Sequence, residues 1–375
     1  MPHIRFSSGY PLVGATLVTA AFIALSACAG GGGRSQPDAE SSYLLVLNKG
    51  AATAALMDPA TGTTLATMPT GDGPHEVAVS PDGRTAVVTN YGGNGAPGST
   101  LTVLDLTTRS ATATIDLAPH RRPHGVAWLP DGRRVVVTLE TDSLVALVNV
   151  EERRVEGTVN TGQRTSHLLR VSNDGAYAYV ANIGSGSVTM IDLAGQYVLR
   201  TTPTGAGAEG LALTPDGSEL WVANRAANTV TVLDAQTLAP RDTLASSVFP
   251  IRVAFTPDGA TALVTNAQSG ELRFFDVRTG ELDGLIAMKV DSGQGRGTML
   301  GMEFGAGTGV PIGMVVTPDS RTAYVANANA DLITVVDVRE RKIAGYLPTG
   351  REPDGMALVP TTPRTITVEE EPPQG

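Results

Sequence analysis

The sequence predicts an all-β fold, a seven-bladed β-propeller made of four-stranded antiparallel blades. Three observations support this prediction. A Pro-Asp-Gly turn recurs along the chain, each copy lies in the same order of short apolar segments, and the two ends of the chain hold complementary parts of one further blade. A repeat of about 40 residues that contains four strands is typical of a propeller blade.

The turn motif is the clearest repeat. Its aspartates are separated by 49, 43, 42, 42 and 61 residues. Proline presets φ and glycine supplies the positive φ that closes a tight hairpin. The copies and variants are Pro81-Asp82-Gly83, Pro130-Asp131-Gly132, Asn173-Asp174-Gly175, Pro215-Asp216-Gly217, Pro257-Asp258-Gly259 and Pro318-Asp319-Ser320.

Four strands are predicted around each turn. An apolar strand such as 76–79 enters the turn, and a second such as 178–182 or 220–224 leaves it. The third, for example 229–234, alternates with period two, as a half-buried strand requires. The fourth is weaker and ends in a polar, glycine-containing loop, as at 66–71.

The two chain ends predict how the ring closes. Residues 43–71 hold the second, third and fourth strands of a blade, and residues 353–359 hold a first strand with nothing after it. Joining them completes a seventh blade and removes exposed sheet edges. The propeller is therefore expected to span residues 43–359.

Two polar residue types recur in nearly every blade. Asparagine and aspartate side chains form hydrogen bonds with the nearby backbone in turns, so both sets of repeated residues are expected to cap strand ends. The asparagines are Asn48, Asn90, Asn182, Asn224, Asn266 and Asn327, and the aspartates are Asp58, Asp105, Asp192, Asp234, Asp276 and Asp337.

Composition excludes several classes of function. The chain has 375 residues, 27 Lys plus Arg and 37 Asp plus Glu, for a net charge of -10, which disfavours nucleic-acid binding. The single cysteine excludes an internal disulfide, a CxxC redox pair and a cysteine-based zinc finger.

The N-terminus predicts export and a lipid anchor. Residues 1–27 are expected to be a lipoprotein signal peptide, because a short apolar stretch ends in Leu25-Ser26-Ala27-Cys28, which resembles the bacterial lipobox. Cys28 would be acylated, and residues 28–42 would form a flexible tether. The resemblance implies a cell-envelope lipoprotein, in the outer membrane facing the periplasm if the organism is Gram-negative. Residues 360–375 are expected to be a disordered, acidic, Pro-rich tail.

Motifs after the turns resemble those of the YVTN/YncE-type β-propeller repeat family. They are Val88-Thr89-Asn90, Tyr179-Val180-Ala181-Asn182, Trp221-Val222-Ala223-Asn224 and Tyr324-Val325-Ala326-Asn327. The third blade departs from the pattern, with Leu139 where the others have asparagine. The resemblance implies the propeller fold; the family includes binding proteins, lactonase-like enzymes and cofactor proteins, so it implies no single function.

Residues that differ between blades point to the mouth of the central channel. The first strand of each blade lies nearest the axis, so the residue that opens it is expected to face the mouth. Around the ring these residues are His75, His124, His167, Glu209, Ile251, Ile312 and Asp354. Histidine titrates near physiological pH and arginine binds carboxylates or phosphates through two donors. The predicted ligand-binding set is His75, His120, Arg121, Arg122, His124, Arg164, His167, Glu209, Arg252, Arg351 and Asp354.

The favoured functional hypothesis is non-catalytic binding of an anionic small molecule or an envelope protein at this mouth, without a cofactor. The alternative reading of the same residues is that they are simply solvated polar groups. An enzymatic alternative is a lactonase-like hydrolase with His167 or Glu209 as general base. Two further alternatives are a propeller similar to the haem d1 type and a copper site built from His75, His124 and His167 with Met299 or Met302 of the long 288–310 insertion.

Overall fold

A computed structural model describes residues 42–93, 95–288, 298–299, 302–303 and 308–362. The chain divides into two compact units, Met1–Asp38 and Ala39–Gly375, and every described residue belongs to the second. The predicted signal peptide, Cys28, nearly all of the tether and most of the acidic tail lie outside the described residues.

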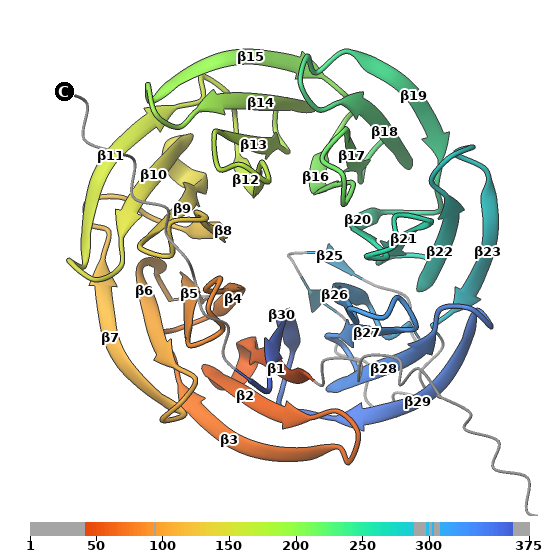
Figure 1. The fold of residues 1–375 in the computed structure, drawn as a ribbon, viewed down its shortest axis with the longest axis horizontal. Coiled ribbons are helices and arrows are strands. Elements are labelled where there is room, and N and C mark those ends of the chain that lie inside the picture. The colour runs from red at the N-terminus through yellow and green to blue at the C-terminus, as the bar shows by residue number, and fades with distance from the viewer. Residues whose placement is uncertain (1–41, 94, 289–297, 300–301, 304–307, 363–375) are drawn as a thin grey trace, which may run out of the picture. The chain divides into compact units, whose positions relative to one another are not determined.

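Seven four-stranded antiparallel sheets surround a central axis (Figure 1). This arrangement confirms the predicted seven-bladed propeller. Blade 1 contains β30 (Pro353–Pro360), β1 (Ser42–Asn48), β2 (Thr53–Asp58) and β3 (Thr63–Pro69), listed from the axis outward. Blade 2 contains β4 (Pro74–Val79), β5 (Thr85–Gly92), β6 (Pro97–Asp105) and β7 (Ser110–Asp116). Blade 3 contains β8 (Pro123–Trp128), β9 (Arg134–Leu139), β10 (Leu144–Asn149) and β11 (Arg154–Asn160).

The remaining four blades repeat this order. Blade 4 contains β12 (Ser166–Val171), β13 (Tyr177–Asn182), β14 (Ser187–Asp192) and β15 (Tyr197–Pro203). Blade 5 contains β16 (Ala208–Leu213), β17 (Glu219–Asn224), β18 (Thr229–Asp234) and β19 (Pro240–Ala245). Blade 6 contains β20 (Pro250–Phe255), β21 (Thr261–Asn266), β22 (Glu271–Asp276) and β23 (Leu282–Ala287). Blade 7 contains β26 (Pro311–Val316), β27 (Thr322–Asn327), β28 (Leu332–Asp337) and β29 (Lys342–Pro348).

Both chain ends build blade 1. The C-terminal β30 pairs antiparallel with the N-terminal β1, with Tyr43 opposite Val359 and Leu45 opposite Ala357. The inner strand β30 in turn contacts the inner strands β4 and β26 of the two neighbouring blades. The ring is therefore closed as the sequence predicts.

Little else interrupts the blades in the described part of the chain. Two short 3-10 turns, η1 (Lys49–Ala51) and η2 (Glu140–Asp142), follow the second strands of blades 1 and 3. A small hairpin of β24 (Thr298–Met299) and β25 (Met302–Glu303) lies within the long insertion. Neither helical turn is long or apolar enough to cross a lipid bilayer.

Apolar side chains fill the spaces between neighbouring blades. Trp221 of blade 5 is 1% exposed, and its ring meets the edge of the Phe275 ring of blade 6 at a centroid distance of 6.3 Å. Period-two strands place such residues on both sheet faces, so each blade adheres to the next. Burial of large aromatic rings is a main source of stability in such packing.

The repeated polar residues serve the architecture. The Asn182 side-chain amide donates to Thr189 Oγ1 at 3.0 Å, and Asp234 Oδ1 accepts the Thr237 backbone N–H at 2.8 Å in the turn from third to fourth strand. In blade 3, Asn149 takes the aspartate's role by accepting the Glu152 N–H at 2.9 Å. These contacts fit the predicted capping role.

Candidate functional site

Each inner strand of blades 2–7 is irregular near the residue that faces the channel mouth. The ladder with the second strand breaks between Pro74 and Val77 in blade 2, and the same break occurs after Pro123 and Ser166. His75, His124 and His167 lie within these breaks. Bulges of this kind redirect side chains and are frequent beside functional sites.

The residue two positions before each mouth residue has a left-handed backbone. In blades 2 and 5 this residue is glycine, but in the others it carries a side chain, which costs about 1–3 kcal/mol per residue. Pairing and packing around the ring must hold these residues in place. The non-glycine positions are Arg122, Thr165, Phe249, Val310 and Glu352, with φ values of 54°, 60°, 66°, 53° and 54°.

Threonine side chains fix the histidine backbones across blade boundaries. Thr89 Oγ1 of blade 2 donates to the His124 carbonyl at 2.8 Å, and Thr138 of blade 3 donates to the His167 carbonyl. Thr138 Oγ1 also accepts the Gly125 N–H at 2.8 Å. Because the strand ladder is broken at these positions, the threonines supply the backbone hydrogen bonds that it leaves out.

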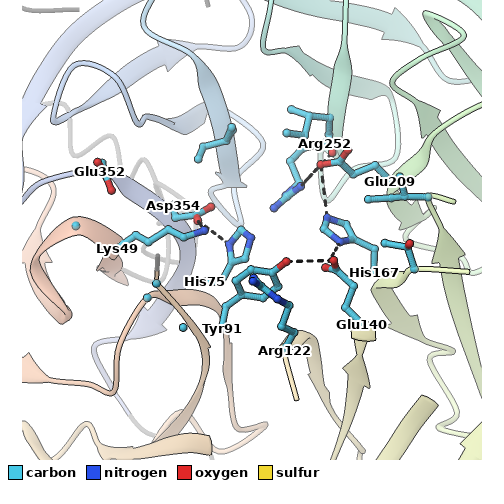
Figure 2. Close-up of a pocket in the computed structure, with 18 of the residues that line it drawn as sticks. Lys49, His75, Tyr91, Arg122, Glu140, His167, Glu209, Arg252, Glu352 and Asp354 are labelled. Atoms are coloured by element: carbon cyan, nitrogen blue, oxygen red, sulfur yellow. Dashed lines mark hydrogen bonds and ion pairs between the residues drawn. The ribbon is translucent and has the colours of Figure 1, made fainter. Parts of the chain in front are cut away.

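The mouth residues surround one cavity of about 860 Å³ (Figure 2). Six of the seven residues named from the sequence line it: His75, His167, Glu209, Ile251, Ile312 and Asp354. The seventh, His124, is 0% exposed. The cavity is thus built by the inner strands of blades 1, 2, 4, 5, 6 and 7.

Three imidazoles from consecutive blades lie against each other. The ring centroids of His75 and His124 are 4.1 Å apart, and those of His124 and His167 are 3.5 Å apart. Neither ring nitrogen of His124 has a hydrogen-bond partner among the described residues. Burial lowers the pKa of His124 well below the usual imidazole value, and the neighbouring His167 and His75 lower it further.

His75 is paired with a buried carboxylate. Its Nδ1 lies 2.6 Å from Asp354 Oδ2, and Lys49 Nζ lies 3.3 Å from the same oxygen. Burial would raise the pKa of Asp354, but the charges of His75 and Lys49 outweigh it, so this pKa is lowered. Asp354 is therefore an ionised group at neutral pH.

His167 lies between two carboxylates. Its Nδ1 is 3.0 Å from Glu140 Oε2, and its Nε2 is 3.6 Å from Glu209 Oε1. Burial would lower the pKa of His167, but the hydrogen bonds to Glu140 and Glu209 raise it overall. Burial would likewise raise the pKa values of Glu140 and Glu209, yet the contact with His167 leaves both lowered.

A buried ion-pair network links opposite parts of the ring. Arg252 of blade 6 donates to Glu76 of blade 2 at 2.5 Å and lies 4.0 Å from Glu209. Arg225 donates to Glu209 at 2.7 Å. Burial would lower the pKa of Arg252, but Glu76 and Glu209 raise it, so the guanidinium stays charged.

Tyr91 and Arg122 line the cavity between His75 and His167 (Figure 2). Tyr91 donates to Glu140 Oε1 at 3.1 Å, and the Arg122 guanidinium lies 4.6 Å from the centre of the tyrosine ring. Burial, reinforced by the Glu140 charge, raises the pKa of Tyr91 to about 12. Among the described residues, no carboxylate oxygen lies within 4.0 Å of Arg122.

Four further residues that the repeat pattern alone does not single out line the cavity: Lys49, Tyr91, Glu140 and Arg225. A signal for them exists. Each directly follows the repeated asparagine near the end of a second strand, or Leu139 at that position in blade 3. The exit of the second strand therefore faces the same cavity as the start of the first strand, and it varies in the same way from blade to blade.

Besides the buried His124, four residues of the predicted ligand-binding set do not line this cavity. His120 Nδ1 is 3.1 Å from Asp142 Oδ2, and Arg164 donates to the Gly184 carbonyl at 2.7 Å. Arg351 donates to the Gly50 carbonyl, and the Arg121 side chain is exposed. Each lies in the loop that precedes an inner strand, before the chain turns toward the axis.

The methionines give the predicted copper site no described ligand. The side chains of Met299 and Met302 lie outside the described residues. Met288, at the start of the same insertion, is 1% exposed and packs in the apolar core between blades 6 and 7.

Comparisons with known proteins agree with this architecture. The sequence model of the family described as "Lactonase, 7-bladed beta-propeller" matches residues 46–296. No curated protein matches the sequence. Among solved structures, a functionally unknown protein from Desulfotomaculum acetoxidans DSM 771 has a TM-score of 0.69 at 14% identity, covering 85% of this chain and 99% of that one. Kuenenia stuttgartiensis hydrazine synthase has a TM-score of 0.63 at 20% identity, covering 76% and 88%. At these identities the two structures show a shared fold alone.

Proposed function

This chain belongs to the family of lactonases with a seven-bladed β-propeller, and we propose that its cavity hydrolyses a small lactone that carries a carboxylate or phosphate group. The observation that carries the proposal is the His75–Asp354 pair on the wall of a cavity that also presents Arg122. A general base and a cation for an anionic substrate thus face one space.

His75 is the proposed general base. The ionised Asp354 lies 2.6 Å from His75 Nδ1, without the alignment of a regular hydrogen bond, and its negative charge favours the tautomer that carries the proton on that nitrogen. Nε2 is then the basic nitrogen, as in other hydrolases whose histidine is oriented by a carboxylate. Because Asp354 is 1% exposed, water competes little for this carboxylate.

Arg122 is the proposed anchor for the substrate's anionic group. Its guanidinium is held over the Tyr91 ring, and no described carboxylate neutralises it within 4.0 Å. Two parallel N–H donors suit a carboxylate or phosphate. Lys49 and Arg252 also line the wall, where their N–H donors can stabilise the oxyanion that forms at the lactone carbonyl while their charges stay paired with Asp354 and Glu76.

The proposed reaction needs only water as second substrate. The water oxygen bonds to the lactone carbonyl carbon while His75 Nε2 accepts the water proton. The ring C–O bond then breaks, and the proton passes to the released ring oxygen. The product is an open-chain hydroxy acid, and the enzyme returns to its starting state.

The test is turnover of paired lactones by the purified full-length chain. Each pair shares a ring and differs only in a carboxylate side group. Wild type should hydrolyse the charged member with the lower KM, and Arg122→Met should raise that KM by about 10- to 100-fold, corresponding to about 1.5–3 kcal/mol for a charge-assisted bond. KM for the neutral member should stay unchanged. No turnover of any lactone, or an equal KM change for both members, would contradict the proposal.

A second candidate is ligand binding without turnover. The ion pairs of Arg252 with Glu76 and of Arg225 with Glu209 favour it, because they make part of the wall a fixed, internally neutralised surface. Saturable binding of an anionic lactone or its hydroxy acid, measured by calorimetry with no change in the ligand, would support this candidate over hydrolysis.

We also propose that the chain is attached to the cell envelope through lipid on Cys28, on the sequence argument alone. Metabolic labelling with a fatty-acid analogue should label wild type and fail to label Cys28→Ala. Equal labelling of both would contradict the anchor.

A further inference from the structure

The stacked histidines offer a site that the proposed hydrolysis does not use. His124 is 0% exposed, and both of its ring nitrogens lack a hydrogen-bond partner among the described residues. A buried polar group without a partner costs about 1–3 kcal/mol. The ring lies 3.5 Å from His167 by centroids, so its neighbour is a second potential nitrogen ligand and not an apolar side chain.

A carboxylate completes a ligand set. The ligating atoms of His124, Glu140 and His167 all lie within 4.8 Å of one another. Two imidazoles with one carboxylate form a common ligand set for zinc and for non-haem iron. We propose that His124, Glu140 and His167 bind one divalent transition-metal ion, of the class of Zn²⁺, Fe²⁺ or Co²⁺.

The surrounding groups favour this trio over a second one nearby. His75, Glu76 and Asp354 also lie within 4.8 Å of one another. However, Asp354 lies 3.3 Å from Lys49, and Glu76 accepts from Arg252 at 2.5 Å, so cations already neutralise both carboxylates. In the described part of the chain, Glu140 has no lysine or arginine partner within 4.0 Å, and its only ion pair is with His167.

Two further groups lie where they would orient the ligands. Glu209 Oε1 is 3.6 Å from His167 Nε2, which leaves His167 Nδ1 toward Glu140 and the ion. Tyr91 donates to the Glu140 oxygen that does not face His167. Carboxylate partners of ligating histidines raise their basicity and fix their orientation.

The chemistry of this ligand set also limits which metal ions it would bind. Calcium and magnesium prefer oxygen ligands, and Cu(I) prefers thiolates and thioethers. Imidazole with carboxylate suits Zn²⁺ and Fe²⁺ better. Since Glu140 and His167 line the cavity, an ion here would be reached from the cavity, and its remaining coordination positions would face it.

The test uses the full-length chain, stripped with a chelator and titrated with Zn²⁺ and then Co²⁺. Wild type should bind about one ion per chain, and the cobalt form should show visible absorption of a four- or five-coordinate site. His124→Phe and Glu140→Gln should lose this absorption and bind Zn²⁺ at least about tenfold more weakly. His120→Phe, which changes the histidine paired with Asp142 outside the cavity, should bind as wild type does.

His124→Phe is informative because it need not disturb the fold. It replaces a buried ring without polar partners by an apolar ring of similar size, so the metal-free variant should melt no lower than metal-free wild type. Zinc should raise the melting temperature of wild type and His120→Phe only. Wild type that binds neither ion, or His124→Phe and Glu140→Gln that bind both like wild type, would overturn the proposal. None of these readouts depends on lactone hydrolysis.

Discussion

The two ends of each inner strand differ in what varies between blades. At the outer end, the strand runs into a turn whose aspartate accepts a backbone N–H in each repeated copy and, outside blade 3, a hydroxyl as well. Asp216 and Asp258 each accept a threonine hydroxyl at 2.6 Å and a backbone N–H at 3.0 Å, whereas Asp131 accepts only N–H groups. At the mouth end, the backbone is also repeated, but the side chains are histidine, carboxylate or isoleucine. Repeated side chains therefore build the ring, and variable side chains on the same repeated backbone build the site.

The largest stability effect should come from the mouth end. Arg252→Met should destabilise the fold by about 3–5 kcal/mol, because the largely buried Glu76 loses the one cation that pairs with it among the described residues, while Glu209 keeps Arg225. Urea unfolding monitored by circular dichroism measures this. Arg241→Met removes an exposed guanidinium that pairs with Glu219 and Asp234, and it should change stability far less. Equal effects of the two variants would mean that the mouth network is not a buried one.

A smaller effect is expected where inner strands approach each other closely. A Cβ on Gly313 would clash with the Asp354 carbonyl oxygen, whereas a Cβ on Gly345 of the outer strand β29 meets nothing within 4 Å. Gly313→Ala should therefore cost about 1–3 kcal/mol of stability, as overpacking does. Gly345→Ala should be neutral in the same urea experiment. A neutral Gly313→Ala would show that the inner strands can separate freely.

The smallest effect on stability should come from protonation of the turn aspartates at low pH. Hydrogen bonds from Ser172, Thr214 and Thr256 lower the pKa values of Asp174, Asp216 and Asp258 below the ordinary 3.8. As pH falls below that value, the unfolded chain takes up protons first, so the stabilisation present above about pH 4 is lost as pH falls through the lowered folded pKa values.

The Asp216→Asn variant tests the contribution of the aspartate charge in one of these turns. The variant should be less stable than wild type at pH 6, and the difference should shrink at pH 3, where wild type has begun to lose the same contribution. Urea midpoints at the two pH values provide the comparison. A difference that does not change with pH would mean that the Asp216 charge does not stabilise the turn.

The sequence predicts the ring well because the ring depends on repeated local signals. The turn motif, the period-two strands and the complementary ends predict all seven blades and the closure by β30 and β1. Symmetry also predicts which first-strand residues face the axis. His124, His167 and Glu209 are adjacent in the structure because consecutive blades repeat the same backbone.

The partners within the site could not be predicted in the same way. The contact between His167 and Glu140 depends on where the chain leaves the second strand of blade 3. Leu139 replaces the usual asparagine there, but this difference by itself does not indicate that the next residue, Glu140, contacts a histidine of blade 4. Proximity in sequence was misleading for His120 and Arg121, because the chain turns sharply at the left-handed Arg122 before reaching the axis. Left-handed Val310 and Thr165 carry no sequence signal at all, since β-branched residues rarely adopt that conformation.

The most direct test of the mouth as a catalytic site compares two histidine variants on one anionic lactone. His75→Asn and His120→Asn make the same chemical change. Only His75 has a proposed catalytic role, since His75 lines the cavity and His120 does not. If His75 is the general base, kcat/KM should fall about 10²- to 10⁴-fold in His75→Asn and stay unchanged in His120→Asn. Full activity in a folded His75→Asn protein would contradict this role.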